Sequence, residues 1–187
     1  MFPLSIFPLP GELVPLHVFE PRYRQLLEDA ETRDISFGIY FNHVSNVKKL
    51  GSLVKLESVI KRYPGGESDV IVKCTDLLEM TTLLRSYRDK LYPGGEVQYW
   101  NVDTTHPVHK KLADAFLEYL SLIKISRHDK SFSAYNIAIE LNLDFEDRIK
   151  FVSLDSDKKE SFLNTRLIYM KQILQRAEKA KDVFHLN

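Results

Sequence analysis

The strongest constraint on the fold is a change in the spacing of apolar residues near His106 and Pro107. Before this point, apolar and polar residues alternate along several short segments, as in half-buried β-strands. After it, apolar residues recur every three or four positions, as on one face of an α-helix. The 187-residue sequence therefore predicts an α+β protein, with a β-rich part over 1–106 and an α-helical bundle over 107–187.

The first part is predicted to be mainly strands, with one early helix. The alternating segments are centred on residues 35–41, 54–60, 70–74, 78–84 and 97–102. Pro21 suits the first position of a helix, and the apolar spacing that follows it predicts a helix over about 21–31.

The segment Tyr-Pro-Gly-Gly-Glu occurs twice, at 63–67 and at 92–96. Proline presets φ at the second position of a turn, and glycine accepts the positive φ that a type II turn needs at the third. Each copy is therefore predicted to close a β-hairpin. A pair of ligand loops or an internal duplication is the alternative reading.

The second part reads as helices with one apolar face each. One apolar stripe begins at Val108 and a shorter one at Phe132, and Asp144 has the position of an N-cap. The last helix is predicted over about 157–181. Its apolar face consists of Leu163, Leu167, Met170, Leu174 and Ala177.

Composition narrows the class of protein. The 26 basic and 26 acidic residues give a formal net charge of zero, which argues against a dedicated DNA-binding protein. The one cysteine, Cys74, excludes internal disulfides and fits a reducing compartment. The start of the chain has no basic segment and carries prolines, and no apolar run is long enough to span a bilayer. We therefore expect a cytoplasmic protein that does not associate with membranes.

Motifs for catalysis and cofactor binding are absent from the sequence. It contains no phosphate loop, dinucleotide fingerprint, H-E-x-x-H motif or nucleophile elbow, so we expect no cofactor and no catalytic residues. His106 and His109 are close enough to share a metal ion, but Pro107 lies between them and solvated side chains are the simpler interpretation. Cys74 lies on an alternating strand face, which favours a buried, inert thiol over a nucleophile.

The densest cluster of unusual residues is segment 7–24. Its four prolines predict a stiff, extended approach to the helix. Arg22 and Arg24 lie in the first helical turn, where the helix dipole disfavours cations. They should therefore either pair with carboxylates such as Glu20 and Glu12 or face a ligand.

The same segment carries a family resemblance. Phe7-Pro8, followed by Pro15-Leu16-His17-Val18-Phe19-Glu20-Pro21-Arg22-Tyr23 and then a helix, resembles the N-terminal substrate-binding domain of Lon proteases. That domain also occurs in stand-alone bacterial proteins, the kind this chain resembles, and inside cereblon. Weaker matches run through 38–39, 51–54, 65–66 and 70–73 to the final helices, so the resemblance covers about 2–178. One departure is Cys74-Thr75-Asp76-Leu77, which stands where the family has G-x-x-R.

The resemblance implies a fold and a binding role. The fold would be a twisted β pseudo-barrel similar to a PUA domain, followed by a helical bundle. The role would be non-catalytic recognition of unfolded or damaged polypeptides, as a holdase or as an adaptor for a separate protease or chaperone, because the motor and peptidase domains of Lon have no counterpart here. The expected binding residues are Leu16, Val18, Phe19 and Tyr23 as an apolar wall, with Glu20 and Arg22 beside them. For Val18, Phe19 and Tyr23, a plain core role is the alternative.

Two other functions compete with polypeptide recognition. A PUA-like domain could bind RNA through exposed aromatic and basic residues. The candidates are Tyr40, Tyr63, Tyr92 and Tyr99 with Lys48, Lys49, Lys61 and Arg62. An enzyme with a small-molecule site of unrecognised type is the third alternative.

Overall fold

The computed structural model describes residues 1–126 and 131–184, with side chains described as far as residue 177. The chain forms two compact units, Met1–Asp103 and Thr104–Asn187. The sequence placed this division between His106 and Pro107. Each unit is described below by itself.

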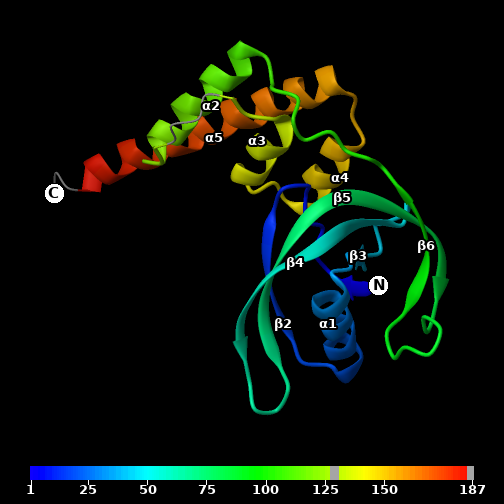
Figure 1. The fold of residues 1–187 in the computed structure, drawn as a ribbon. Helices are drawn as coiled ribbons and strands as arrows, with labels where there is room; N and C mark the ends of the chain where they lie inside the picture. Colours follow the sequence, from blue (N-terminus) through cyan, green and yellow to red (C-terminus); the bar gives the residue numbers. More distant parts are fainter. Residues whose placement is uncertain (127–130, 185–187) are drawn as a thin grey trace. The chain divides into compact units, whose positions relative to one another are not determined.

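The first unit is a curved six-stranded sheet built around one helix (Figure 1). Its elements are β1 (Phe2–Leu4), β2 (Leu13–Val18), α1 (Pro21–Arg33), β3 (Phe37–Phe41), β4 (Leu50–Arg62), β5 (Ser68–Leu84) and β6 (Gly94–Tyr99). The strand order is β1-β3-β4-β5-β2, and β6 pairs with the second half of β5. Only β1 and β3 are parallel. The sheet is strongly twisted but does not close, which agrees with a pseudo-barrel.

The two apolar segments expected at 70–74 and 78–84 are one strand, β5, and not two. The pairing with β4 slips where Leu53 opposes Asp76 and Val54 opposes Cys74, so Thr75 is an extra residue on β5. The bulge shifts the alternation of inward and outward side chains by one residue, and Leu77 and Leu78 are both buried. Because the apolar pattern changes phase at this point, the sequence predicted two strands where the structure has one.

The core of this unit lies between α1 and the inner face of the sheet. The buried side of α1 consists of Tyr23, Leu26, Leu27 and Ala30, as the spacing predicted. Opposite it lie alternate residues of β4 and β5, namely Val54, Val70, Val72 and Cys74. The helix begins with Pro21 at its first turn and ends where Asp34 takes a left-handed conformation, with φ of 52°.

The two glycine-rich segments differ in the structure. At Tyr63–Glu67 a turn joins β4 to β5, with Gly66 N–H donating to the Tyr63 carbonyl at 2.9 Å. The positive φ, 91°, belongs to Gly66 and not to Gly65, so the turn is not the type II turn expected. The second copy does not close a hairpin: Gly94 and Gly95 already belong to β6.

The second unit consists of four helices, α2 (Lys110–Leu122), α3 (Ala134–Glu140), α4 (Phe145–Val152) and α5 (Ser156–Phe184). Its core includes Phe116, Phe151, Leu163 and Leu167, all fully buried. Asp144 accepts a hydrogen bond from Asp147 N–H and caps α4, as predicted. Met170 and Leu174 are only half-buried, and Ala177 is exposed, so the predicted apolar face of α5 is fully packed only along its first half.

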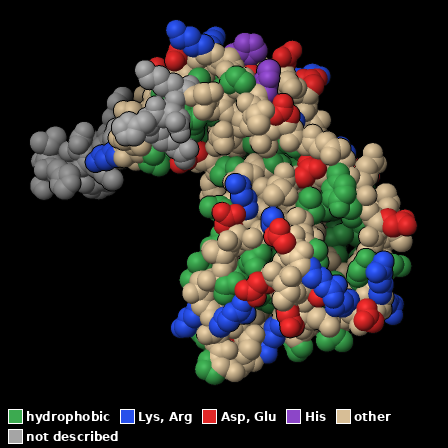
Figure 2. All heavy atoms as spheres, viewed as in Figure 1, with side chains coloured by type: hydrophobic (Ala, Val, Ile, Leu, Met, Phe, Trp, Pro, Cys, Tyr) green, Lys and Arg blue, Asp and Glu red, His purple; other side chains and the backbone are tan. Residues whose placement is uncertain are grey.

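Surface features agree with the neutral composition. Figure 2 shows basic and acidic side chains interspersed over the visible face, with no large field of one sign. Among the helices of residues 1–126 and 131–184, none is long and apolar enough to cross a membrane.

Candidate functional site

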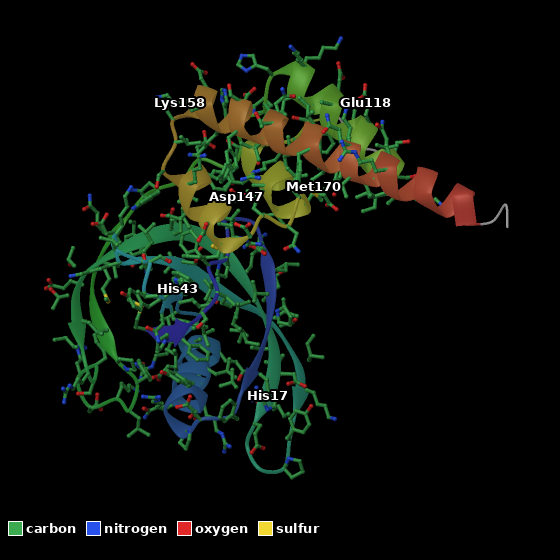
Figure 3. All side chains as sticks on the ribbon, turned by 180° about the vertical axis from the view of Figure 1, so that it is seen from behind. His17, His43, Glu118, Asp147, Lys158 and Met170 are labelled. Carbon is green, nitrogen blue, oxygen red and sulfur yellow. The ribbon has the colours of Figure 1, made fainter. Side chains whose placement is uncertain are left out.

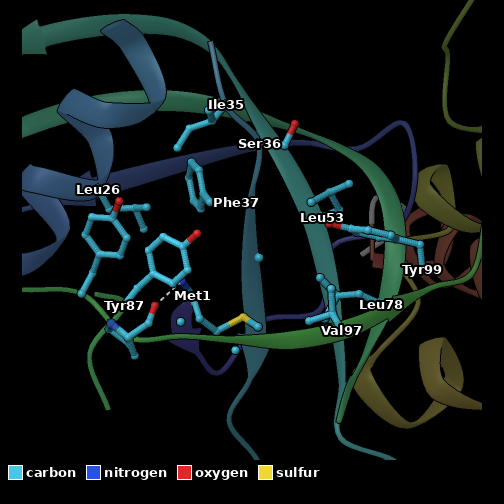
Figure 4. Close-up of a pocket in the computed structure, with 15 residues that line it drawn as sticks. Met1, Leu26, Ile35, Ser36, Phe37, Leu53, Leu78, Tyr87, Val97 and Tyr99 are labelled. Atoms are coloured by element: carbon cyan, nitrogen blue, oxygen red, sulfur yellow. Dashed lines mark hydrogen bonds between the residues drawn. The ribbon is translucent and has the colours of Figure 1, made fainter. Parts of the chain in front are cut away.

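A cavity of about 350 Å³ opens in the first unit, between α1 and the strands β3, β5 and β6 (Figure 4). The lining is formed by Met1, Leu26, Ile35, Ser36, Phe37, Gly38, Leu53, Leu78, Tyr87, Tyr92, Pro93, Gly94, Gly95, Val97 and Tyr99. Its size is at the lower end of the range for small-ligand pockets and suits one or two side chains. Most of these residues are apolar or aromatic, so the cavity favours carbon-rich groups.

Exposed apolar side chains lie next to residues that line this cavity. Leu83 and Leu84 on β5 pair with the lining residues Gly95 and Gly94, and Leu91 precedes the lining residue Tyr92; each leucine is about half exposed or more. Tyr87 and Tyr99 line the cavity and also face solvent. We refer to these five residues as the apolar rim. Exposed apolar groups beside a hollow are typical of a surface that binds another molecule.

Two glycines let the cavity wall form. A Cβ on Gly95 would lie 2.1 Å from the Thr82 carbonyl oxygen of the neighbouring strand, so only glycine permits this pairing. A Cβ on Gly94 would lie 2.6 Å from the ring of Tyr87. The second Tyr-Pro-Gly-Gly segment therefore serves close packing beside the cavity, whereas the first makes a turn.

The loop that carries Tyr87 to Pro93 is held on α1 by buried polar contacts. Tyr92 donates a hydrogen bond to Asp29 at 2.7 Å, and the Lys90 ammonium lies 2.9 Å from the same carboxylate. The contacts with Lys90 and then Tyr92 lower the pKa of Asp29, while burial and Asp29 raise the pKa of Tyr92 to about 12. Gln25 also accepts a hydrogen bond from Leu91 N–H. The loop that carries two residues of the rim, Tyr87 and Leu91, is therefore anchored to the helix.

The amino group of Met1 closes one side of the cavity. It donates to the Pro93 carbonyl at 2.7 Å, and burial lowers its pKa to about 6 (Figure 4). The Met1 side chain lies against Gly38 on β3. No charged side chain lines the cavity among the described residues, so its lining offers shape and apolar surface rather than charge.

None of the six predicted binding residues lines this cavity. Val18 and Tyr23 are 3% exposed and belong to the core, and Leu16 packs partly against it. The core alternative is therefore correct for Val18 and Tyr23. Phe19 is different: its side chain is 56% exposed and stacks on His17, whose position on β2 is marked in Figure 3.

The two arginines of the first helical turn both have protein partners. Arg22 pairs with Glu20 at 2.7 Å, one of the pairs expected from the sequence. Arg24 pairs instead with Glu67 and donates to the carbonyls of Phe19 and Gly65. Glu12, the other carboxylate considered for this role, accepts a hydrogen bond from Leu9 N–H. Arg24 thus joins the start of α1 to the β4–β5 turn.

Several of the residues considered for nucleophilic, metal-binding and RNA-binding roles are buried or contact other protein side chains. Cys74 is 1% exposed, which confirms that its side chain is buried, and burial raises the pKa of its thiol to about 12, which favours an inert thiol. His109 lies 3.0 Å from Glu160, and no cluster of three metal-ligating residues occurs among the described side chains. Of the tyrosines considered for RNA stacking, Tyr92 is buried and Lys61 covers the ring of Tyr63.

The cavity was not predicted from the sequence. Its residues come from segments more than 60 positions apart, and Tyr87 and Leu91 lie in a loop without periodicity. The one available signal was the second Tyr-Pro-Gly-Gly segment, because glycine pairs outside a turn often mark close backbone approach.

A family model and solved structures are similar to this chain. The model of the ATP-dependent protease La (LON) substrate-binding domain matches residues 1–152. Among solved structures, the chain is similar to a Lon N-terminal domain protein from Xanthomonas campestris, with a TM-score of 0.65 and 24% identity over 90% of this chain and 96% of that one. It also matches the N-terminal domain of a Mycobacterium avium complex Lon protease, with a TM-score of 0.47 and 15% identity over 92% and 94%. Curated proteins give no significant match.

Proposed function

Since the chain belongs to the family of Lon substrate-binding domains, as its sequence motifs predicted, we propose that it recognises exposed apolar side chains of unfolded or partly folded polypeptides. It holds these segments without catalysing a reaction on them. The observation that carries this proposal is the apolar cavity of the first unit, together with the exposed apolar rim beside it.

The size and chemistry of the cavity fit this kind of ligand. Unfolded chains expose large apolar side chains that folded proteins bury. Burying one such side chain contributes about 1.5–3 kcal/mol, and the ordering of the client opposes this gain. A single pocket therefore gives weak binding, and contacts along the rim at Leu83, Leu84 and Leu91 add the rest. Recognition would be broad in sequence, since no charged side chain of the lining selects a partner.

Of the binding residues expected at the start of α1, we keep Phe19 as a proposed client contact and assign Val18 and Tyr23 to the core. Phe19 offers an exposed aromatic face, with the Arg22–Glu20 ion pair close by. Val18 and Tyr23 support this surface from the core rather than contact a client. We propose Phe19 as a secondary contact for the polypeptide, tested separately from the cavity.

The proposal is tested by fluorescence anisotropy with a labelled polypeptide that has been reduced and alkylated so that it stays unfolded. We expect saturable binding that changes little between low and physiological salt. Val97→Phe, which fills the cavity, and Tyr99→Ser, which removes part of its wall, should each weaken binding by roughly tenfold, the equivalent of about 1.4 kcal/mol.

The matched control for Tyr99→Ser is Tyr169→Ser on α5, which removes a tyrosine of similar exposure from the other unit. If the control weakens binding as much as the cavity variants, or if no variant has an effect, the cavity is not the client site. A labelled single-stranded RNA is measured in parallel. Binding of RNA alone, with steep loss at higher salt, would favour the RNA-binding alternative.

A further inference from the structure

A second hollow lies within the helical unit, where the first turns of α5 pass the end of α4. Its volume is about 520 Å³. The ring of Phe162 lies among its lining residues with Leu154, and three cationic side chains complete the lining, namely Lys150, Lys158 and Arg166. We refer to this hollow as the basic groove. It has both an apolar and a charged component, unlike the cavity of the first unit.

Two of the cations are close to the same aromatic ring. The Lys150 ammonium lies 5.6 Å from the centroid of Phe162, and the Arg166 guanidinium carbon lies 5.4 Å from it. Cations at this distance interact with the ring quadrupole. The contacts hold positive charge beside Phe162, where an anionic group on a ligand can approach it.

The basic groove has more cationic side chains than carboxylates paired with them. Arg166 is paired with Asp147 on α4, and Lys158 lies 2.7 Å from Asp155. Asp147 and Lys158 are labelled in Figure 3. Lys150 has no carboxylate partner among the described side chains, and it is exposed. Three cations against two carboxylates leave one positive charge in excess. The groove therefore attracts a moderately acidic ligand.

The distance between Lys150 and Phe162 defines the shape of that ligand. Lys150, the cation without a carboxylate partner among the described side chains, lies 5.6 Å from the centroid of the Phe162 ring. An extended peptide rises about 3.3 Å per residue, so side chains two residues apart are separated by a similar distance. We propose that the basic groove binds an extended acidic peptide that places an apolar residue against Phe162 and an Asp or Glu, two positions away, beside Lys150.

Hydroxyl groups in the groove argue for a peptide over a phosphate-rich ligand. Ser161 already donates to the Asp157 carbonyl at 3.0 Å, and Thr165 donates to the Ser161 carbonyl at 3.0 Å. Neither hydroxyl hydrogen is free for a phosphate oxygen. The centre of the groove is apolar, so it needs a carbon-rich group between the charges. An acidic peptide supplies both.

This inference is separate from the proposed function. The groove lies in the second unit, and its α5 residues follow residue 152, where the family match ends. The α5 part of the groove therefore lies outside the residues that the family model matches, and failure at either site leaves the other untouched.

The test uses the full chain and a labelled peptide with Asp-Ser-Phe-Ser-Asp at its centre. Saturable binding is expected in anisotropy at low salt. A peptide of the same composition with both Asp residues at one end, and one with Asn in place of Asp, should each bind at least about tenfold more weakly. Lys150→Glu should also reduce affinity about tenfold, because the excess charge is reversed. Circular dichroism establishes that the variant is folded.

Lys110→Glu is the matched control, since Lys110 is exposed on α2 and the charge change is the same. The proposal is overturned if this control weakens binding as much as Lys150→Glu, if the rearranged peptide binds as well as the designed one, or if no peptide binds. A labelled single-stranded RNA is included. RNA binding that is lost in Lys150→Glu, without peptide binding, would identify the groove as a polyanion site and also overturn the proposal.

Discussion

The Tyr92 hydroxyl donates to the Asp29 carboxylate at 2.7 Å and thereby joins the loop beside the cavity to the buried side of α1. Sixty-three positions separate the two residues. Lys90 contacts the same carboxylate, so one buried acid holds two residues of the loop. A buried carboxylate is tolerated because both contacts favour its charged form. The contacts of the loop that carries Tyr87 and Leu91 therefore favour the ionised form of Asp29.

We expect Tyr92→Phe to destabilise the protein by about 1–3 kcal/mol at neutral pH, the usual range for a hydrogen bond to a buried charged acceptor. The pKa of Asp29 is lowered below 3.8 in the folded state, so its contribution is present above that pH and is lost as the pH falls through the folded value. The difference in free energy of unfolding between wild type and variant should therefore shrink in acid. Urea titrations at neutral and acidic pH measure it.

Tyr99→Phe is the control for this experiment, because Tyr99 is about half exposed and its hydroxyl makes no contact with Asp29. A Tyr92→Phe effect that is independent of pH would show that the packing of Tyr92, and not the carboxylate, holds the loop.

The hydroxyl of Tyr23 is buried and finds no hydrogen-bond partner among the described residues. Its ring stacks on Phe2 with 4.1 Å between centroids. Removing only the hydroxyl, in Tyr23→Phe, should leave stability unchanged or raise it by about 1 kcal/mol, because an unsatisfied polar group is costly to bury. Tyr23→Ala should cost about 3–5 kcal/mol through loss of the ring. Thermal unfolding of both variants compares the two effects. A marked loss in Tyr23→Phe would mean that the hydroxyl has a partner.

Much of the fold could be predicted because local patterns were strong. The α1 spacing, the Asp144 cap and the long last helix all depend on residues close in sequence. The β5 strand was divided in two because one extra residue, Thr75, reverses the alternation, and a bulge cannot be distinguished from a strand end without its partner strand.

The site was harder to predict than the fold. Val18 and Phe19 are neighbours in an apolar segment, yet one is buried and the other is exposed because adjacent residues face opposite ways at the end of a strand. Sequence alone did not show which of the two faces the core. The cavity depends on contacts such as Tyr92 with Asp29, which only the folded chain brings together.

The two glycines of the second Tyr-Pro-Gly-Gly segment are expected to differ in how much an added methyl group destabilises the protein. Gly95→Ala should destabilise the protein by about 1–3 kcal/mol, because its Cβ would meet the backbone carbonyl of Thr82 at 2.1 Å. Gly94→Ala should cost less, since its Cβ meets the ring and the Cβ of Tyr87, which lies in the loop between β5 and β6, and a loop can shift more easily than a paired strand. Chemical denaturation ranks the two variants. Equal effects would mean that the loop at Tyr87 is as rigid as the strand.

The movement of Tyr87 has its own consequence for the cavity. Because Tyr87 lines the cavity, Gly94→Ala should change the free energy of client binding by more than it changes the free energy of unfolding. Anisotropy with the unfolded polypeptide, measured on the folded variant, checks this point. Unchanged affinity would place the client contact away from Tyr87.

Cys74 offers a direct measure of how often the sheet opens. Its thiol is 1% exposed, lies in the part of β5 that pairs with β4, and has a pKa of about 12. Since the thiolate is the reactive form, alkylation of the native protein at neutral pH should be very slow and should accelerate when denaturant exposes the strand. Mass spectrometry of iodoacetamide-treated protein follows the reaction, with fully denatured protein as the reference. Rapid alkylation without denaturant would contradict this expectation and indicate that β5 separates from its neighbours in the native state.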